Sequence, residues 1–193
     1  RHELTARFSL NRVVQSGARL PLEKLDWISG DYIRRMPLEE VVAGILPFLK
    51  AKGWIAPTPT AQELHLVTQI ATGERERLRW FAQITELTSW IFDRDGAFDE
   101  KAAANLKKDD ARVTLEAYAP ILLAGDFSDS AKLEADARAW CERQGIGFGK
   151  LVHPVRAALT RRTTGPGLFH CAMMLGKTES ERRIAQALVF AKA

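Results

Sequence analysis

The spacing of apolar residues constrains this chain most, because it follows the α-helical repeat along most of the sequence. After Pro37, apolar residues recur every three or four positions, at Leu38, Val41, Val42, Ile45, Leu46 and Leu49. This spacing puts them on one face of a helix, and a proline is tolerated in the first helical turn. Segments that alternate apolar and polar residues between tight hairpin turns are hard to find. The sequence therefore predicts an all-α fold.

Glycine and proline residues mark where the predicted helices end. Gly53 ends the first of them, and the proline-rich stretch 56–60 forms a rigid connection to the next. Apolar spacing predicts another helix over 76–92 and one over about 150–160. We expect the final helical region to be split at Gly176.

A change in composition divides the chain after the stretch 93–96, which reads Asp-Arg-Asp-Gly. Beyond it, an acidic and alanine-rich region runs to about residue 144. We place a domain boundary there, since 193 residues allow one large domain or two small ones. The chain begins without Met in what reads as the middle of an element, so we expect a fragment of a longer polypeptide.

The charge of the chain is only mildly basic, with 28 Lys and Arg residues against 24 Asp and Glu and a net charge of +4. So small an excess does not separate nucleic-acid binding from chance, and the position of the charges matters more. Between residues 150 and 193, eight Lys or Arg residues accompany two acidic residues, Glu179 and Glu181. Positive charge is therefore concentrated toward the C-terminal end of the sequence.

The sequence lacks the motifs of common catalytic and metal sites. The cysteines, Cys141 and Cys171, have no nearby partner, and the four histidines share no metal-ligand spacing. No HExxH, GxSxG, P-loop or GxGxxG motif is present. No apolar run approaches the roughly 18 residues that span a bilayer. We therefore expect a cytoplasmic chain without a membrane span, metal, cofactor or catalytic residue of its own.

Several arginines lie beside aromatic residues and glycines, an arrangement suited to holding single-stranded RNA. They occur in the stretch 74–80, which ends on Trp80, at Arg138 near Trp140, and through 153–169. Unpaired bases stack on aromatic or guanidinium planes and are read on their Watson–Crick edges. From these residues alone, a solvated helix face for the arginines and a core position for the aromatic rings stay open.

Six stretches, in order along nearly the whole chain, resemble bacterial-type glutamyl-tRNA synthetases. The resemblance implies an all-α C-terminal fragment with two consecutive helical anticodon-binding domains, over 35–96 and 97–193, preceded by the end of a stem-contact segment over 1–34. The implied partners are tRNA(Glu) and the N-terminal catalytic domain of the same polypeptide. ATP and Mg would act in that parent enzyme, a glutamate–tRNA ligase, while the fragment itself is an inactive monomer. The stretches are 8–13, 22–34, 97–103, 149–160, 165–169 and 175–177.

The same resemblance implies which residues meet the anticodon loop. Arg77 matches the arginine that reads the third anticodon base, and Arg138 and Arg156 match two further arginines that contact the loop. His153, Gly165 and Leu168 match further positions at its bases. Four more arginines stay open between RNA-backbone contacts and solvated surface: Arg75, Arg79, Arg161 and Arg162.

Base chemistry agrees with the role implied for Arg77. Cytosine offers its O2 and N3 atoms as acceptors to a guanidinium, whereas guanine presents N1–H and N2–H donors there. Donors would then face donors, so the wrong base is penalised. Glutamate and glutamine anticodons differ by C or G at the third base, so we expect discrimination against the glutamine tRNA.

Two alternatives remain beside this interpretation. The first is a helical protein–protein interaction module that docks through Leu38, Val41 and Ile45, or through Met173 and Met174. The second is a stand-alone paralogue that acts on tRNA in trans.

Overall fold

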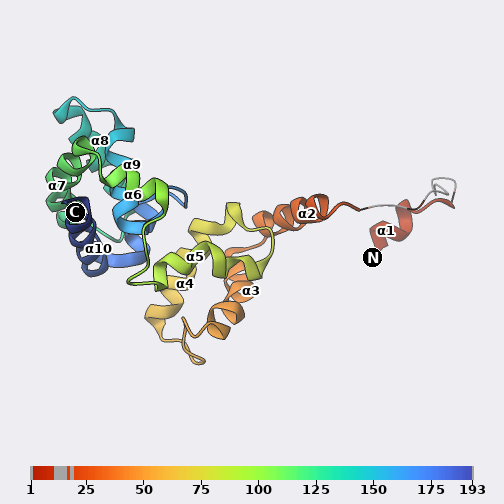
Figure 1. The fold of residues 1–193 in the computed structure, drawn as a ribbon. Helices are drawn as coiled ribbons and strands as arrows, with labels where there is room; N and C mark the ends of the chain where they lie inside the picture. The colour runs from red at the N-terminus through yellow and green to blue at the C-terminus, as the bar shows by residue number, and fades with distance from the viewer. Residues whose placement is uncertain (1, 11–16, 18–19, 193) are drawn as a thin grey trace.

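The computed structural model describes residues 2–10, 17 and 20–192, and every regular element among these residues is a helix (Figure 1). The predicted all-α fold is therefore confirmed. Residues 11–13, which belong to the first of the stretches behind the resemblance, lie outside the described residues. The α-helices are α1 (His2–Arg7), α2 (Leu22–Arg35), α3 (Leu38–Ala51), α4 (Ala61–Glu74), α5 (Ile84–Phe92), α6 (Glu100–Leu106), α7 (Asp109–Ala124), α8 (Ser130–Gln144), α9 (Phe148–Thr160) and α10 (Leu168–Lys192).

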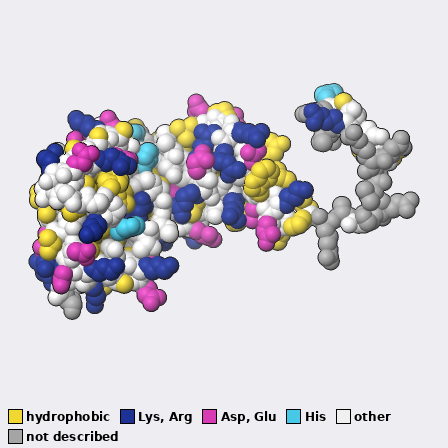
Figure 2. All heavy atoms as spheres, turned by 90° about the horizontal axis from the view of Figure 1, so that it is seen from above, with side chains coloured by type: hydrophobic (Ala, Val, Ile, Leu, Met, Phe, Trp, Pro, Cys, Tyr) yellow, Lys and Arg dark blue, Asp and Glu magenta, His cyan; other side chains and the backbone are white. Residues whose placement is uncertain are grey.

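The helices form two units, which we define as residues 38–92 and residues 100–192 (Figure 1). Each unit has a hydrophobic cluster of its own. The first cluster contains the fully buried Ile45 and Ile70, and the second contains the fully buried Leu115 and Leu151. Helix α2 extends from the first unit toward the N-terminus (Figure 1). Figure 2 shows Lys and Arg side chains on both units with Asp and Glu among them, so positive charge forms no uninterrupted patch on this face.

Helix α10 connects the two clusters. Gly176 has a φ of 71° and a ψ of 171°, which interrupts α10 and confirms the split expected at this glycine. Before the kink, Leu168 and Ala172 are buried in the second cluster. Cys171 and Met174, on another face of the same turns, are buried in the first cluster. One helix therefore contributes to both cores.

The ends of α3 and α4 follow from local sequence signals. Helix α3 begins directly after Pro37, and Gly53, with a φ of 69°, follows its C-cap. Helix α4 begins with a capping box in which the Thr60 hydroxyl accepts from the Glu63 backbone while the Glu63 carboxylate accepts from the Thr60 backbone. These contacts lower the pKa of Glu63.

The single helix expected over 76–92 is wrong. Two short 3-10 helices, η2 (Arg75–Arg77) and η3 (Phe81–Gln83), stand between α4 and α5, and Leu78 between them is extended with a ψ of 130°. The fully buried Leu78 and the packing of η3 on α3 favour this path. At Gly44 of α3 an added Cβ would lie 2.5 Å from the Phe81 ring. Arg77 therefore stands at a bend in the chain.

Three arginines of the second unit hold the linker between the units, and we call Arg161, Arg182 and Arg183 the linker clamp. Arg183 is 1% exposed and donates to the carbonyl oxygens of Leu159 at 2.8 Å, Ile91 at 3.2 Å and Asp93 at 3.3 Å. These bonds satisfy carbonyls at the C-terminal end of α5, where helical partners run out. They also join α5, the linker and α9 through one side chain.

Arg161 and Arg182 hold the next residues of the linker. Arg161 is 7% exposed and donates to the carbonyls of Gly96 and Arg94, the latter at 2.6 Å. Arg182 also donates to the Arg94 carbonyl at 2.6 Å and pairs with Asp95 at 3.0 Å. Hydrogen bonds from Arg182 lower the pKa of Glu179 to about 2, with a further contribution from Arg183.

We expect Arg183→Met to lower the free energy of unfolding by about 2–4 kcal/mol, because it leaves buried carbonyls without donors. Urea unfolding followed by circular dichroism measures this change. The matched control is Arg182→Met, since 34% of the Arg182 side chain is exposed. Its loss should be about 1 kcal/mol or less. Equal losses for the two variants would contradict the structural role of Arg183.

Candidate nucleic-acid interface

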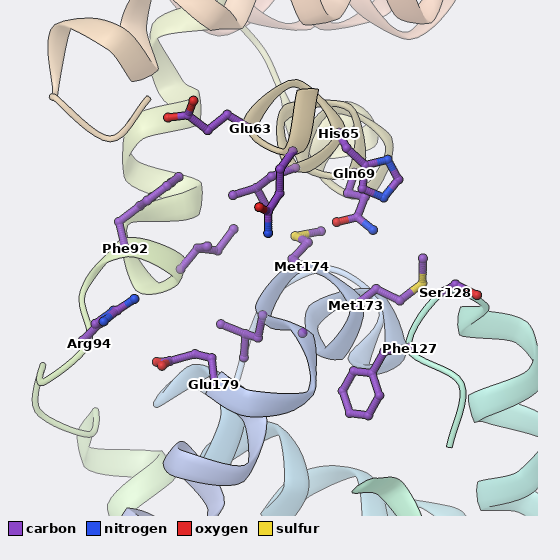
Figure 3. A pocket seen from close by; sticks show the side chains of 15 residues that line it. Glu63, His65, Gln69, Phe92, Arg94, Phe127, Ser128, Met173, Met174 and Glu179 are labelled. Carbon is purple, nitrogen blue, oxygen red and sulfur yellow. The ribbon is translucent and has the colours of Figure 1, made fainter. Parts of the chain in front are cut away.

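A pocket of about 730 Å³ lies between α4, α10 and the loop from α7 to α8 (Figure 3). Glu63 and His65 reach it from α4, opposite Met173 and Glu179 from α10. Both carboxylates already have internal partners, because Glu63 caps α4 and Glu179 pairs with the linker clamp. None of the residues expected to meet the anticodon loop lines this pocket. The pocket and the predicted arginines are therefore separate features.

The predicted arginines of the two units meet at the C-terminal end of α4. An added Cβ at Gly73 would lie 2.4 Å from Cε of Met174, 3.5 Å from Cβ of Pro166 and 3.7 Å from Cδ2 of His170. A glycine here lets α4 approach α10 and the turn before it closely. This contact brings η2, which follows directly, near the second unit.

Arg77 is held by the last residue of α4. Its Nη1 atom donates to Oε2 of Glu74 at 2.6 Å. The Glu74 side chain is fully buried, whereas 36% of the Arg77 side chain is exposed. Burial raises the pKa of Glu74, with Arg77 acting in the opposite direction. One end of the ion pair is thus enclosed and the other end faces solvent.

Arg156 lies on the other side of this contact, on α9. Its Nη1 atom donates to the carbonyl oxygen of Pro166 at 2.7 Å and lies 4.0 Å from Sγ of Cys171. An added Cβ at Gly165 would lie 3.2 Å from the same Nη1 atom. Arg156 therefore supports the turn at 165–167, and Gly165 leaves room for its guanidinium.

Glu74, which holds Arg77, follows Gly73, and an added Cβ at Gly73 would lie 3.5 Å from Cβ of Pro166, whose carbonyl accepts from Arg156. Sγ of Cys171 lies 4.0 Å from Nη1 of Arg156 at the same contact. Burial raises the pKa of this thiol to about 12, while the charges of Arg156 and Arg77 lower it and that of Glu74 raises it. The structure thus brings Arg77 and Arg156 to one place, which we call the arginine cluster and define as Glu74, Arg77, Arg156, Pro166 and Cys171.

Arg138 and His153 lie along the rest of α9. His153 is exposed and shares a helical face with Arg156, one turn away. The Arg138 guanidinium lies over the ring of Phe148, 4.0 Å from its centroid, and pairs with Glu134 at 2.6 Å. Phe148 is the first residue of α9 and lies about 12 Å along the helix axis from Arg156. The contact of Arg138 with the anticodon loop stays a prediction.

The four arginines that stayed open have different surroundings. Arg75 donates to the carbonyls of Arg34 and Met36 and so closes the C-terminal end of α2. Arg162 donates to Oγ of Ser89 at 2.7 Å and ties the second unit to α5. Arg79 is exposed and lies two residues after Arg77. The neighbouring Trp80 is exposed as well, at 42%.

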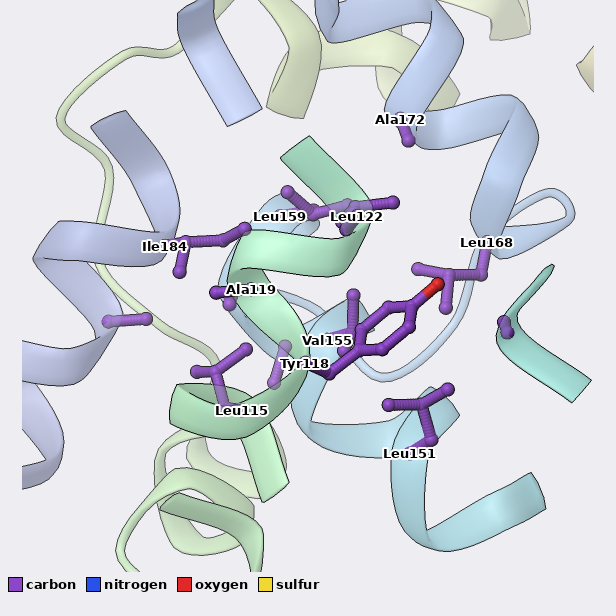
Figure 4. Close-up of a cluster of buried hydrophobic side chains, with 14 of the residues drawn as sticks. Leu115, Tyr118, Ala119, Leu122, Leu151, Val155, Leu159, Leu168, Ala172 and Ile184 are labelled. Carbon is purple, nitrogen blue, oxygen red and sulfur yellow. The ribbon is translucent and has the colours of Figure 1, made fainter. Parts of the chain in front are cut away.

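Two of the residues considered for contact with RNA, Leu168 and Arg161, are buried and make contacts inside the protein. Leu168 is 4% exposed and packs with Leu151 and Val155 in the second cluster (Figure 4), so its side chain faces the core instead of a base. Arg161 directs its donors at the linker carbonyls, so we assign it to the clamp in place of an RNA-backbone contact. The residues that Leu168 and Arg161 contact are far from them in the sequence, so a local sequence pattern does not predict these contacts.

Glu74 was not predicted from the sequence as a functional residue. Its spacing of three residues from Arg77 is a recognisable ion-pair signal on a helix. The alternation of Glu and Arg over 74–77, however, reads equally as a solvated face. Only the fold distinguishes the buried Glu74 from its exposed neighbour Glu76.

Among the residues that the structure describes, no group of three His, Cys, Asp or Glu side chains could hold a metal ion. No helix in the same described ranges is long and apolar enough to cross a membrane.

The chain matches one family profile and is similar to proteins that share one name. The profile described as "Anticodon binding domain" matches residues 40–188. The chain is 34% identical over 182 residues to a glutamate–tRNA ligase of Carboxydothermus hydrogenoformans, covering 94% of this chain and 38% of that protein. It is 37% identical over 190 residues to a glutamate–tRNA ligase of Roseiflexus sp., covering 97% of this chain and 37% of the relative. The chain thus spans well under half the length of these relatives.

A solved structure has the same fold. It is the crystal structure of a glutamate tRNA ligase from Elizabethkingia meningosepticum in complex with its amino acid, with a TM-score of 0.83 at 24% sequence identity. The match covers 97% of this chain and 36% of that one.

We expect the effect of Glu74→Gln on stability to depend on pH. The pKa of Glu74 is raised in the folded chain, so its stabilising contribution is present below the pKa of the unfolded chain and is lost as pH rises through the folded value. The stability of the variant relative to the unmodified chain should therefore rise between about pH 4 and pH 7. Urea unfolding at several pH values measures this difference.

Glu63→Gln is a control of opposite sign. The pKa of Glu63 is lowered, so its contribution is present at neutral pH and is lost as pH falls through the folded value. The stability of this variant relative to the unmodified chain should therefore fall as pH rises to about 5, because the ordinary pKa of a glutamate is 4.5, and should stay constant above that pH. A parallel trend for both variants would contradict the assigned environments.

Proposed function

Because its residues 40–188 match the family profile, the chain belongs to the anticodon-binding-domain family, and we propose that it binds the anticodon loop of tRNA(Glu) as the C-terminal part of a glutamate–tRNA ligase. The observation that carries the proposal is the arginine cluster, where Arg77 and Arg156 come from different units and are held on either side of the contact between Gly73 and Pro166. A loop of unpaired bases is a ligand that such a junction suits, because guanidinium groups both pair with and stack on bases.

Arg77 is the residue that we assign to the third anticodon base. Part of its guanidinium faces solvent while Nη1 is engaged by Glu74. The free N–H groups match the O2 and N3 acceptors of cytosine and oppose the donors of guanine. This assignment makes the chain selective against the glutamine tRNA.

The other contacts are proposed by position. His153 and Arg156 offer an exposed edge of α9, and Gly165 lies in the turn that Arg156 supports. Arg138, over the ring of Phe148, extends this edge toward the start of α9. Arg79 supplies a further exposed guanidinium for the RNA backbone. The role of Leu168 is limited to fixing the start of α10.

The ligase reaction itself is assigned to the parent polypeptide. The parent would activate glutamate with ATP and Mg²⁺ and esterify the terminal ribose of the tRNA, in a cytoplasmic, monomeric enzyme. In this proposal, the part of the present chain is to hold the distant end of the same tRNA.

Three of the five residues that suggested a protein-docking module are inaccessible to a partner, whereas Leu38 and Met173 are only partly buried. Val41 and Ile45 are fully buried in the first cluster, and Met174 is 5% exposed at the contact between α4 and α10. These side chains form the core and are not free to receive a partner.

We expect salt-dependent binding of an RNA stem-loop with a glutamate anticodon. Fluorescence anisotropy between about 50 and 200 mM salt should give an affinity that falls linearly on a log–log plot, by about 0.7–0.9 per phosphate contact. With few phosphate contacts, the dissociation constant should be micromolar or weaker, on the order of 10⁻⁶–10⁻⁴ M. Binding that is insensitive to salt and to the anticodon would overturn the proposed function.

We expect Arg77→Gln to abolish the preference for cytosine over guanine at the third anticodon position. The unmodified chain should prefer the cytosine stem-loop by about 1–3 kcal/mol. The matched control is Arg79→Gln, which removes a neighbouring exposed guanidinium and should weaken both stem-loops equally. A preference that survives in Arg77→Gln would exclude Arg77 as the reader of this base.

A further inference from the structure

Glu74 stands where a carboxylate is costly for three independent reasons. Its side chain is fully buried, and charge in a low-dielectric interior is penalised. It is the last residue of α4, where the helix dipole disfavours negative charge. Its Oε1 atom is buried and finds no hydrogen-bond partner in the part of the chain that the structure describes. A residue placed here for stability alone would be apolar or neutral.

The remaining oxygen of Glu74 makes one short contact, to Nη1 of Arg77 at 2.6 Å. The enclosed end of this pair is the carboxylate, and the accessible end is the guanidinium. Since Glu74 has no exposed surface, it does not touch a bound base directly. Its effect on RNA must therefore pass through Arg77.

We propose that Glu74 is a positioning residue that fixes the orientation of the Arg77 guanidinium and thereby sets the base preference of the site. The proposal rests on the proposed function. An arginine side chain free in solvent loses rotamer entropy when a ligand orders it. Holding Nη1 in advance removes part of that loss, because the planar fork is already aimed.

Fixing the fork also sharpens rejection of the wrong base. A mobile guanidinium can rotate away when guanine presents its N1–H and N2–H donors, so the mismatch lowers the affinity for guanine only slightly. A guanidinium held through Nη1 keeps its remaining donors directed at that edge, so donor meets donor. Glu74 thus increases the difference in affinity between the cytosine and guanine stem-loops more than it increases the affinity for the cytosine stem-loop.

The experiment compares two RNA stem-loops that differ only by cytosine or guanine at the third anticodon position. Their affinities are measured by anisotropy for the unmodified 193-residue chain, Glu74→Gln, Arg77→Gln and the double variant. Glu74→Gln keeps the side-chain volume and removes the charge. Circular dichroism and urea unfolding verify that each variant is folded.

We expect Glu74→Gln to reduce the cytosine-to-guanine preference by about tenfold, mostly through tighter binding of the guanine stem-loop. In the Arg77→Gln background, the same substitution should leave the ratio of the two affinities unchanged, because there is no guanidinium left to orient. A merely structural role would lower both affinities alike and would add to the effect of Arg77→Gln.

Glu76→Gln is the matched control for charge. Glu76 lies two residues further along in η2, is exposed, and its replacement removes the same single negative charge. It should strengthen both stem-loops equally and leave the preference unchanged. A similar loss of preference in Glu76→Gln would assign the effect to overall charge and overturn the role of Glu74.

The two proposals fail in different ways. If the unmodified chain prefers cytosine and Arg77→Gln loses that preference while Glu74→Gln keeps it, only the positioning role is overturned. If the unmodified chain shows no anticodon preference, the reading of the third base fails, and the positioning role fails with it.

Discussion

Guanidinium groups bonded to backbone carbonyls determine how the two halves of this molecule are related. Arg183 binds carbonyls from α5, from the linker and from the end of α9, and Arg161 binds the linker residues that follow. Carbonyls in a linker have no helical partner, so without these donors the junction would be open to water. Because Arg77 and Arg156 lie on opposite sides of that junction, their proximity depends on the buried Arg161 and Arg183.

Arginine therefore has two separate tasks in this chain, and the partners of each guanidinium distinguish them. In the linker clamp the fork geometry of the guanidinium joins several carbonyls at once, which a lysine would not do. In the arginine cluster the same group is held on one side by Glu74 or by the Pro166 carbonyl and left accessible on the other. The first task fixes the shape of the surface, and the second supplies its chemistry.

The helices could be predicted from the sequence where their ends depend on local backbone chemistry. Pro37, Gly53 and Gly176 act through their own φ preferences, so their effect does not depend on the rest of the fold. The bend at 75–83 could not be predicted, because Leu78 and Phe81 keep helical spacing while packing against α3 dictates the path.

The candidate site was predictable only in part, for a similar reason. Local pattern picks out the arginines beside aromatic residues, and the resemblance to a family suggests which of them meet RNA. Their division into clamp and cluster depends on partners far along the chain: Arg161 bonds a carbonyl 65 residues away, and Arg183 one 92 residues away. The spacing of residues within a helix does not predict such contacts. It does not predict the burial of Glu74 either, because that burial also depends on the fold.

The kinked helix α10 affects how the two units unfold. Its first turns bury Cys171 and Met174 in one core and Leu168 and Ala172 in the other. Neither core can lose its packing without exposing side chains of the other, so the two units share their cooperativity. Heating should melt both in a single transition, and a cavity made in one core should lower the melting temperature of the whole chain.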